Sequence, residues 1–528
     1  MAIAVTLLLA SDVRAAVYVV DTWTEFADAV DAMNDTNLHR DEDVTIEVAS
    51  GTILYPPSFQ QVTIAPPVDG NSKAIKAAST GSVLVINCVW LIDSTANVTI
   101  EGLDFVRTIW TLPGSAAHQS GLLNIWDSED VEILDCSFDE LVKSPPSGTI
   151  YRYITLHGDS NKVENCSFES KDSVGDCIYA AINDTAVNTH SIRYCDFYGP
   201  IGGHSAIRLG TTKRNPSGQV NAHLNQSDGK CLIYRCVFAD FDDSDSEVIS
   251  SKSDFNRFIE NSFLNCKSFL TLRTGDHCTV FGNRFIGGEA GLRINGGHHT
   301  ILNNYFGSIA GSDSSGLQKG AVCFVGGRPS HDTNAVHYEA AHHCTFAFNT
   351  INDSKRMVMF CGYSEAGGWA TEFPHDNVIE HNILYSQYEF LHPNQDIQKV
   401  SPQTLLRIST PWHSPNPPSS AQISAWQSNT IEGNLLHSNG HGKPLVNDVA
   451  TWGWIWDGEV RKNLLEDQCS HAVTLGSSGD WTPDPVISGA VDMGWNWQYY
   501  QLMFSLYTDF DGISRSGPYD LGCHEVQP

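Results

Sequence analysis

A short apolar motif recurs along the chain: Asn or Cys, then any residue, then Phe or an aliphatic residue. Clear copies include Cys136–Phe138, Cys166–Phe168 and Asn283–Phe285, and weaker copies continue to Asn463–Leu465. Successive copies lie 21 to 52 residues apart, and the shortest spacings cluster near 22 residues. A period of this length, rich in aromatic and β-branched residues, is typical of one coil of a right-handed parallel β-helix. The longer spacings indicate loops inserted into individual coils.

Stacked coils place equivalent residues in ladders, because each coil lies about 4.8 Å above the last. A buried Asn ladder can form hydrogen bonds along the stack, whereas Cys and Phe ladders can pack. Two other repeat folds are less consistent with the pattern. A leucine-rich repeat needs L-x-x-L-x-L runs at constant period, and a β-propeller needs blades of about 40 residues. The sequence therefore predicts an all-β fold, a parallel β-helix.

Both ends of the chain depart from the repeat. Residues 24–33 place apolar side chains at helical spacing, which predicts a short amphipathic helix capping the N-terminal end of the solenoid. The repeats thin out from about residue 386, and eight of the 13 Trp residues follow residue 401. These Trp residues would either pack around an irregular C-terminal end or stack on sugar rings. We expect a signal peptide at 1–16, the catalytic β-helix at 17–385, and further coils with a Trp-rich cap at 386–528.

Composition and charge narrow the function. The apolar run Ala2–Ala10 precedes small residues at Ala15–Ala16, which indicates a secretory signal and a secreted or periplasmic protein. We expect no membrane partner, because the run is too short to span a bilayer and no later run reaches 18 apolar residues. A net charge of -30 argues against nucleic acid as a partner. Several of the 14 cysteines recur at one repeat position, which favours buried packing over disulfides.

Charged residues gather in one pair of predicted coils. Asp245 and Glu247 lie two residues apart, Lys252 follows, and Arg273 lies 21 residues after Lys252, close to one coil. This spacing predicts that Lys252 and Arg273 are neighbours on adjacent coils. Two acids and two cations on one outer face indicate a functional cluster, although surface ion pairs on a solvated acidic turn would give the same pattern.

Two further arginines extend this cluster along the predicted helix. Arg208 belongs to the coil before the acidic turn, and Arg293 belongs to the coil after Arg273. A row of basic side chains on an acidic protein suits repeated carboxylates or sulfates on a chain-like ligand. Alternatively, each Arg pairs with a local acid.

Several stretches around this cluster resemble polysaccharide lyase family 6, which contains alginate lyases and chondroitinase B. They are Glu247-Val-Ile-Ser-Ser-Lys-Ser253, Leu270-Thr-Leu-Arg-Thr-Gly275 and the stretch from Gly291 to Phe306, which begins Gly-Leu-Arg-Ile-Asn-Gly. The resemblance covers about residues 80–365. It implies β-elimination at a 4-linked uronic acid in an anionic polysaccharide, with alginate as the first expectation.

The resemblance also assigns roles to individual residues. Lys252 would be the base, and Arg273 the acid or charge stabiliser. A second group would contact the substrate: Arg208, Arg293, His299 and Thr274. Calcium would be held by Asp245 and Glu247 and would meet the substrate carboxylate.

The calcium shell departs from the family pattern. Where the family reads N-G-G-E-T, this chain reads Gly202-Gly-His-Ser-Ala206, so the third calcium ligand is missing at Gly202. Either His204 or Ser205 takes the place of that ligand, although His is a poor calcium ligand, or Arg208 or a water neutralises the substrate in a calcium-free site. Two other functions stay open: an inverting glycoside hydrolase that uses Asp245 and Glu247, and a non-catalytic polysaccharide-binding β-helix.

Overall fold

The fold is known from a computed structural model. The structure describes these residues: 15–35, 37–38, 42–58, 60–68, 70–107, 121–140, 150–169, 171, 173–182, 188–199, 205–210, 228–242, 247–312, 319–327, 338–352, 354, 358–361, 372–386, 406–409, 428–432, 434–438, 464–465, 474–475 and 481–482. Of the predicted signal peptide, residues 1–14 lie outside this set, as do most of residues 386–528, including the Trp residues of the predicted cap other than Trp481. Strand β1 begins at Ala15, so it includes the small residues of the expected cleavage site.

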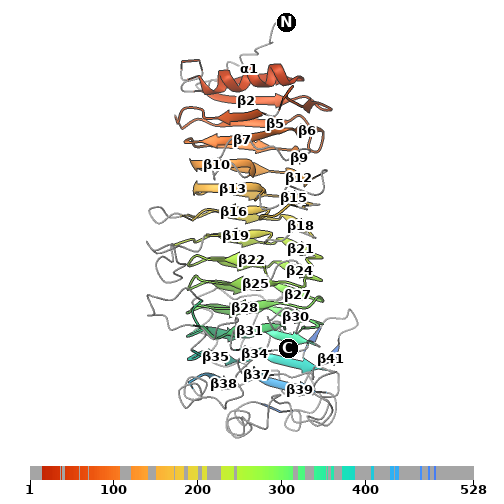
Figure 1. The fold of residues 1–528 in the computed structure, drawn as a ribbon, viewed down its shortest axis with the longest axis vertical. Coiled ribbons are helices and arrows are strands. Elements are labelled where there is room, and N and C mark those ends of the chain that lie inside the picture. The colour runs from red at the N-terminus through yellow and green to blue at the C-terminus, as the bar shows by residue number, and fades with distance from the viewer. Residues whose placement is uncertain are drawn as a thin grey trace. The chain divides into compact units, whose positions relative to one another are not determined.

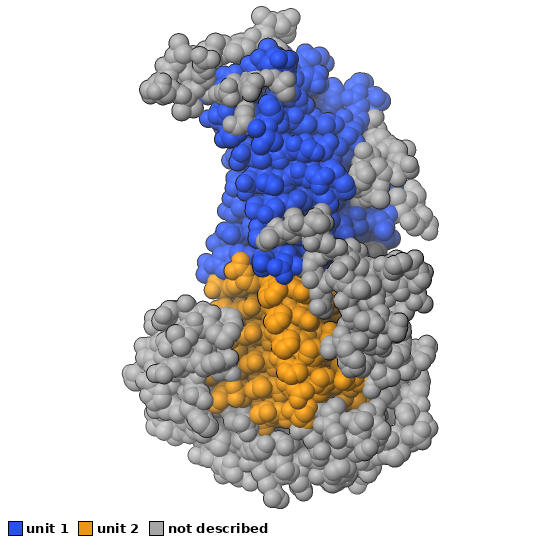
Figure 2. Space-filling view, turned by 90° about the vertical axis from the view of Figure 1, so that its left-hand side faces the viewer, with its two compact units in different colours: residues 1–211, 227–253 blue, residues 212–226, 254–528 orange. Residues whose placement is uncertain are grey.

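The chain forms two compact units, each of which is a parallel β-helix (Figures 1 and 2). The first comprises residues 1–211 and 227–253, and the second comprises residues 212–226 and 254–528. Each fully described coil carries three strands, and the three series of strands form three parallel sheets. The expected right-handed parallel β-helix is confirmed. The described helix is not long and apolar enough to cross a membrane.

In the first unit the three series pair in strict coil order. The first series comprises β1 (Ala15–Val20), β2 (Asp43–Val48), β5 (Lys73–Ala77), β8 (Val98–Glu101), β11 (Glu132–Leu134), β14 (Lys162–Glu164), β17 (Ser191–Arg193) and β20 (Leu232–Tyr234). The second comprises β3 (Ile53–Leu54), β6 (Val83–Ile86), β9 (Leu103–Arg107), β12 (Ser137–Glu140), β15 (Ser167–Phe168), β18 (Asp196–Tyr198) and β21 (Val237–Ala239). The third comprises β4 (Gln60–Ile64), β7 (Cys88–Asp93), β10 (Gly121–Glu129), β13 (Arg152–Asp159), β16 (Ile178–Ala180), β19 (Ile207–Leu209) and β22 (Glu247–Ser251).

The second unit repeats the arrangement. Its first series comprises β23 (Arg257–Ile259), β26 (Thr279–Phe281), β29 (Thr300–Leu302), β32 (Thr345–Ala347), β35 (Val378–Glu380) and β38 (Thr430–Glu432). The second comprises β24 (Ser262–Leu264), β27 (Arg284–Ile286), β30 (Tyr305–Gly307), β33 (Thr350–Asn352), β36 (Ile383–Ser386), β39 (Leu435–Ser438) and β40 (Leu464–Leu465). The third comprises β25 (Phe269–Leu272), β28 (Leu292–Ile294), β31 (Val322–Val325), β34 (Val358–Cys361) and β37 (Leu406–Ser409). Strands β41 (Thr474–Leu475) and β42 (Trp481–Thr482) form an antiparallel pair.

The repeat motif forms the predicted ladders inside each unit. In the first unit, the rings of Phe138, Phe168 and Phe197 stack at centroid distances of 5.0 and 4.6 Å. In the second unit, Asn283 donates a side-chain hydrogen bond to Asn304 at 2.9 Å, and Asn304 donates one to Asn349 at 2.9 Å. These amides are fully buried, and the ladder satisfies polar groups that would otherwise destabilise the core.

Cysteine takes the place of Asn in the first unit. Cys136, Cys166 and Cys195 are buried and form no disulfide, and burial raises the pKa of each thiol. Each sulfur lies near a carbonyl of the preceding coil, at 3.6 to 3.8 Å. The predicted packing role of these cysteines is confirmed.

The predicted capping helix is present as α1 (Trp23–Asn34). Thr22 is its N-cap and accepts a hydrogen bond from the backbone of Glu25 at 3.3 Å, while the Glu25 carboxylate accepts one from the backbone of Asp21 at 3.2 Å. These two hydrogen bonds fix the start of the helix. The buried face includes Phe26, which stacks on Trp90 of β7 at 5.3 Å. The helix therefore covers the apolar end of the first unit (Figure 1).

Candidate active site

Lys252 lies one residue beyond the end of β22. Its backbone N–H donates to the carbonyl of Leu209 at 2.8 Å, and Arg208 pairs with Ser250 in the parallel register. Side chains alternate across a strand, and Leu209 and Ile249 are fully buried in the core. Arg208 and Lys252 therefore extend from the outer face of the third sheet of the first unit, two register positions apart.

Arg208 belongs to a charge cluster around a buried carboxylate, which we call the Asp176 cluster: Arg152, Asp176, Tyr179 and Arg208. Asp176 is 1% exposed, and its carboxylate lies 3.2 Å from Nε of Arg208 and 3.6 Å from Nε of Arg152. The Arg152 guanidinium stacks over the Tyr179 ring at 4.2 Å. Burial lowers the pKa of Arg152, and the Asp176 charge opposes that effect. The cluster holds Arg208 in place at the outer face.

Arg273 and Arg293 meet in the second unit through Tyr338. Arg273 follows the end of β25, and Arg293 is the central residue of β28, paired with Thr271. The Cζ atoms of Arg273 and Arg293 lie 4.7 and 5.6 Å from the Tyr338 ring centre, and Arg273 donates a hydrogen bond to the Tyr338 hydroxyl. Arg293 is only 2% exposed, whereas Arg273 is half-buried, so Arg273 is the cation of this pair that can reach a substrate carboxylate.

Tyr338, Asp176 and Arg152 are absent from the sequence prediction. Tyr338 and Asp176 lie in segments outside the repeated strands, where the sequence period does not predict the position of a side chain. Tyr179 lies 29 residues before Arg208 and pairs with it in register. Extending the predicted row by one coil would have found Tyr179.

His299 and Thr274 lie in the interior of the second unit. His299 is 1% exposed; its Nδ1 accepts a hydrogen bond from the backbone of Cys278 at 3.1 Å, and its Nε2 lies 3.0 Å from the carbonyl of Asn295. Burial lowers the pKa of His299 to about 3, so the ring is neutral. His299 fixes the turn after Arg293. Thr274 is 5% exposed. Their expected contact with substrate stays a prediction that this burial does not support.

The expected calcium ligands are only partly described. Glu247 is the first residue of β22 and is 2% exposed. Asp245 and Gly202 lie outside the described residues. Calcium takes six to eight oxygen ligands, and the described part of this region supplies one carboxylate from the predicted set. The described donors do not make up a calcium site, so no catalytic step is assigned to the ion.

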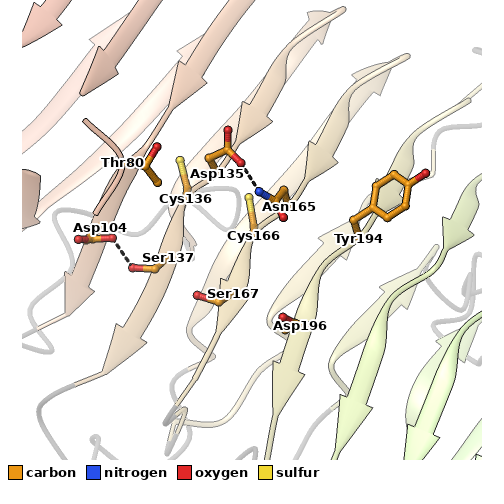
Figure 3. Close-up of a pocket in the computed structure, with 10 residues that line it drawn as sticks. All are labelled: Thr80, Asp104, Asp135, Cys136, Ser137, Asn165, Cys166, Ser167, Tyr194 and Asp196. Atoms are coloured by element: carbon orange, nitrogen blue, oxygen red, sulfur yellow. Dashed lines mark hydrogen bonds between the residues drawn. The ribbon is translucent and has the colours of Figure 1, made fainter. Parts of the chain in front are cut away.

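A surface hollow of about 230 Å³ lies elsewhere in the first unit. Figure 3 shows its lining, which includes Asp104 of β9, Asp196 of β18 and Asp135 in the turn before β12. Ser137 of β12 donates a hydrogen bond to Asp104, and Asn165, just before β15, donates one to Asp135. These strands belong to the second series, whereas Lys252 follows a strand of the third. Three carboxylates would repel a polyuronate, so we do not assign substrate to this hollow.

A family comparison decides the class of protein. The model of the chondroitinase B family matches residues 106–401, which is more than half of the chain. The chain belongs to the chondroitinase B family. This confirms the resemblance to polysaccharide lyase family 6 and makes the chain a member of a polysaccharide lyase family. The matched segment includes Lys252, Arg273, the Asp176 cluster and Tyr338.

Solved structures share the fold of this chondroitinase B family member. A family 6 polysaccharide lyase from Pseudopedobacter saltans is 18% identical, with a TM-score of 0.57, over 80% of this chain and 93% of that chain. A mannuronic-acid-specific family 6 lyase from human gut microbiota is 18% identical, with a TM-score of 0.61, over 85% and 90%. A family 6 alginate lyase in complex with a trisaccharide is 17% identical, with a TM-score of 0.61, over 91% and 93%. No curated protein matches the chain in sequence.

Proposed function

We propose that this protein cleaves a 4-linked uronic acid polymer, with alginate as the preferred substrate, by β-elimination. The observation that carries the proposal is a repeated local arrangement. Lys252 and Arg273 each follow the last residue of a third-series strand. In the first unit, Arg208 lies on the strand next to the one before Lys252. In the second unit, Arg293 lies on the strand next to the one before Arg273. These residues fall within the segment that matches a lyase family. A polymer of this kind does not cross membranes, so we also propose a secreted or periplasmic location.

Lys252 is the proposed base. In β-elimination the base removes the C5 proton, the C5–H electrons form the C4–C5 double bond, and the C4–O4 bond breaks. The neutral amine is the form that accepts a proton. A nearby cation and the exclusion of water by bound substrate both favour the neutral amine. Arg208 is the nearby cation within the first unit.

The arginines supply the positive charge that the reaction needs. Neutralising the substrate carboxylate makes the C5 proton acidic, and Arg208, held by Asp176, is our candidate for that role. Arg273 is the candidate for stabilising charge on the departing O4, which takes its proton from a water molecule. A guanidinium rarely gives up its proton, so we assign Arg273 an electrostatic role, with its orientation fixed by the Tyr338 hydroxyl.

A polymer panel tests the proposal. The chain is incubated with alginate, polygalacturonate and a chondroitin-type polymer, with and without a calcium chelator, and the absorbance of unsaturated uronate is followed. We expect product from at least one uronate polymer, the largest yield from alginate, and activity that survives the chelator. Loss of activity with the chelator would assign carboxylate neutralisation to calcium instead of Arg208.

Two lysine variants separate catalysis from general damage. Lys252→Ala should abolish product formation. Lys230→Ala, whose lysine makes a surface ion pair with Asp228 at 2.9 Å, should leave it unchanged. Binding of polymer without any product would favour a non-catalytic polysaccharide-binding protein. Saturated products with new reducing ends would favour a hydrolase.

A further inference from the structure

Aromatic rings and imidazoles form a column in the second unit, away from the repeated core ladders. Phe255 stacks on His277 at 5.0 Å, His277 on His298 at 4.8 Å, and His298 on His343 at 5.1 Å. Each of these residues has a positive φ of 51 to 58°, so each occupies the same corner of its coil. His342 lies beside the column, with its ring edge toward His298. The coil geometry therefore brings three imidazoles together.

The nitrogens of His298, His342 and His343 form a compact set. One ring nitrogen from each lies within 4.8 Å of the others, and Nδ1 of His342 is 3.0 Å from Nδ1 of His343. Three imidazoles leave a fourth position for a water, which suits a tetrahedral metal ion. Imidazole ligands favour zinc, copper or nickel over calcium and magnesium.

The protein orients the buried member of this set. Nε2 of His342 lies 2.9 Å from the Glu339 carboxylate, which favours the tautomer that donates a hydrogen bond from Nε2–H and leaves the Nδ1 lone pair directed toward His343. A carboxylate behind a ligating imidazole is the usual support of a protein metal site. Gly297 makes room for this ring, because a Cβ atom at this position would lie 2.2 Å from Cε1 of His342.

A second set of groups shares His343 but is less suitable. It comprises His343, His375 and Asp376. Nδ1 of His375 already lies 2.7 Å from the Asp376 carboxylate, and its Nε2 lies 3.4 Å from that of Glu372. Both nitrogens of His375 are therefore engaged with acids, whereas Nδ1 of His342 faces another imidazole.

We propose that His298, His342 and His343 bind one zinc ion, with Glu339 orienting His342. The ion would join the corner after β28 to the segment 338–343. That segment carries Tyr338, whose hydroxyl accepts a hydrogen bond from Arg273. Zinc binding would thus stabilise the segment that holds Arg273, and it needs none of the ligands expected for calcium.

The column offers a matched control for the test. His298→Phe removes a ligand and keeps a ring that can stack, and His277→Phe makes the same change one coil earlier without touching the nitrogen set. Metal-free protein is titrated with zinc against a chromogenic chelator, with calcium as a second titrant. We expect one zinc per chain, no competition by calcium, at least tenfold weaker binding in His298→Phe and unchanged binding in His277→Phe.

Two more variants test the ligand set. His343→Phe should weaken zinc binding as His298→Phe does, and Glu339→Gln should weaken it about 10- to 100-fold. Zinc should also raise the melting temperature of the wild type but not that of His298→Phe. The proposal fails if zinc does not bind stoichiometrically, or if His277→Phe is as damaging as His298→Phe. It also fails if His375→Phe weakens zinc binding and His298→Phe does not.

Discussion

Asp176→Asn isolates the role of the buried carboxylate in the Asp176 cluster. The substitution keeps the size of the side chain and removes its charge. With an effective dielectric of about 20, a unit charge pair at these distances is worth about 5 kcal/mol for Arg208 at 3.2 Å and about 5 kcal/mol for Arg152 at 3.6 Å. Desolvation offsets most of this attraction, so the pairs themselves contribute far less.

Asp176→Asn lowers the free energy of unfolding because it leaves the charges of Arg152 and Arg208 without their buried partner. Breaking a buried pair by removing one partner costs about 3–5 kcal/mol. The side chains of Arg152 and Arg208 are 13% and 21% exposed, so solvent screens part of their charge. We therefore expect the lower end, a loss of about 3 kcal/mol in the free energy of unfolding. Urea unfolding followed by circular dichroism measures this loss.

A double-mutant cycle distinguishes this charge effect from a packing defect. Arg208→Met removes one of the two cations, so Asp176→Asn should cost less in that background, by at least about 1 kcal/mol. A loss below about 1 kcal/mol for Asp176→Asn alone would refute the account of the cluster. Strict additivity in the cycle would refute the coupling between Asp176 and Arg208.

Three other predictions concern the core, Tyr338 and pH. Asn304→Ala should reduce the free energy of unfolding by about 2–3 kcal/mol, because it leaves buried partners in the ladder unsatisfied; urea unfolding checks this. Tyr338→Phe keeps the ring but removes the acceptor of the Arg273 hydrogen bond, so kcat/KM on the uronate polymer should fall about tenfold without loss of stability; an unchanged value would contradict the assigned role. Burial lowers the pKa of His190 to about 4 and that of His299 to about 3, below the unfolded value of about 6.5. The unfolded chain therefore takes up more protons below pH 6.5, so stability is complete above that pH and falls as the pH drops toward 4. His190→Asn should flatten this dependence in unfolding measured across that pH range, and an equally steep dependence in the variant would contradict the assignment to His190.

The core was predictable because its residues recur at fixed positions of the sequence repeat. Asn304 is at the first position of the repeat motif and Phe168 is at the third. Each residue type recurs at its own fixed position of the coil, so stacked coils place equivalent residues above one another. The capping helix followed from helical spacing of apolar residues, and Phe26 on Trp90 confirms its buried face. In each case a local period determines which side of the element is buried.

The site was predictable only where it lies on the repeat. Arg208 and Arg293 occupy strand positions, so the strand face on which each side chain lies followed from the period, while the predicted basic row stays a prediction. Tyr338 and Asp176 lie outside the repeated strands, and the partner that each finds depends on the path of a segment without a period. The same limit applies to His299, because the motif around it gives its place in the chain but neither its burial nor its two backbone contacts.

The corners of the coils were also not foreseen. The residue before each ladder position has a positive φ, as at Asp135, Asn165, Tyr194 and Arg235. Asn and Asp tolerate this conformation, whereas for Tyr and Arg it raises the conformational free energy by about 1–2 kcal/mol. The coil imposes a positive φ at this position whatever residue is present, so the residue types do not predict this conformation.

Cleavage of the polymer in water enriched in heavy oxygen tests the central claim most directly. Products of the wild-type chain acting on alginate are analysed by mass spectrometry. β-Elimination breaks the C4–O4 bond without adding water, so the account predicts products with a C4–C5 double bond, lighter by one water than hydrolysis products, and with no heavy oxygen incorporated during cleavage. Saturated products that carry one heavy oxygen per cleavage would contradict it and would identify the protein as a hydrolase.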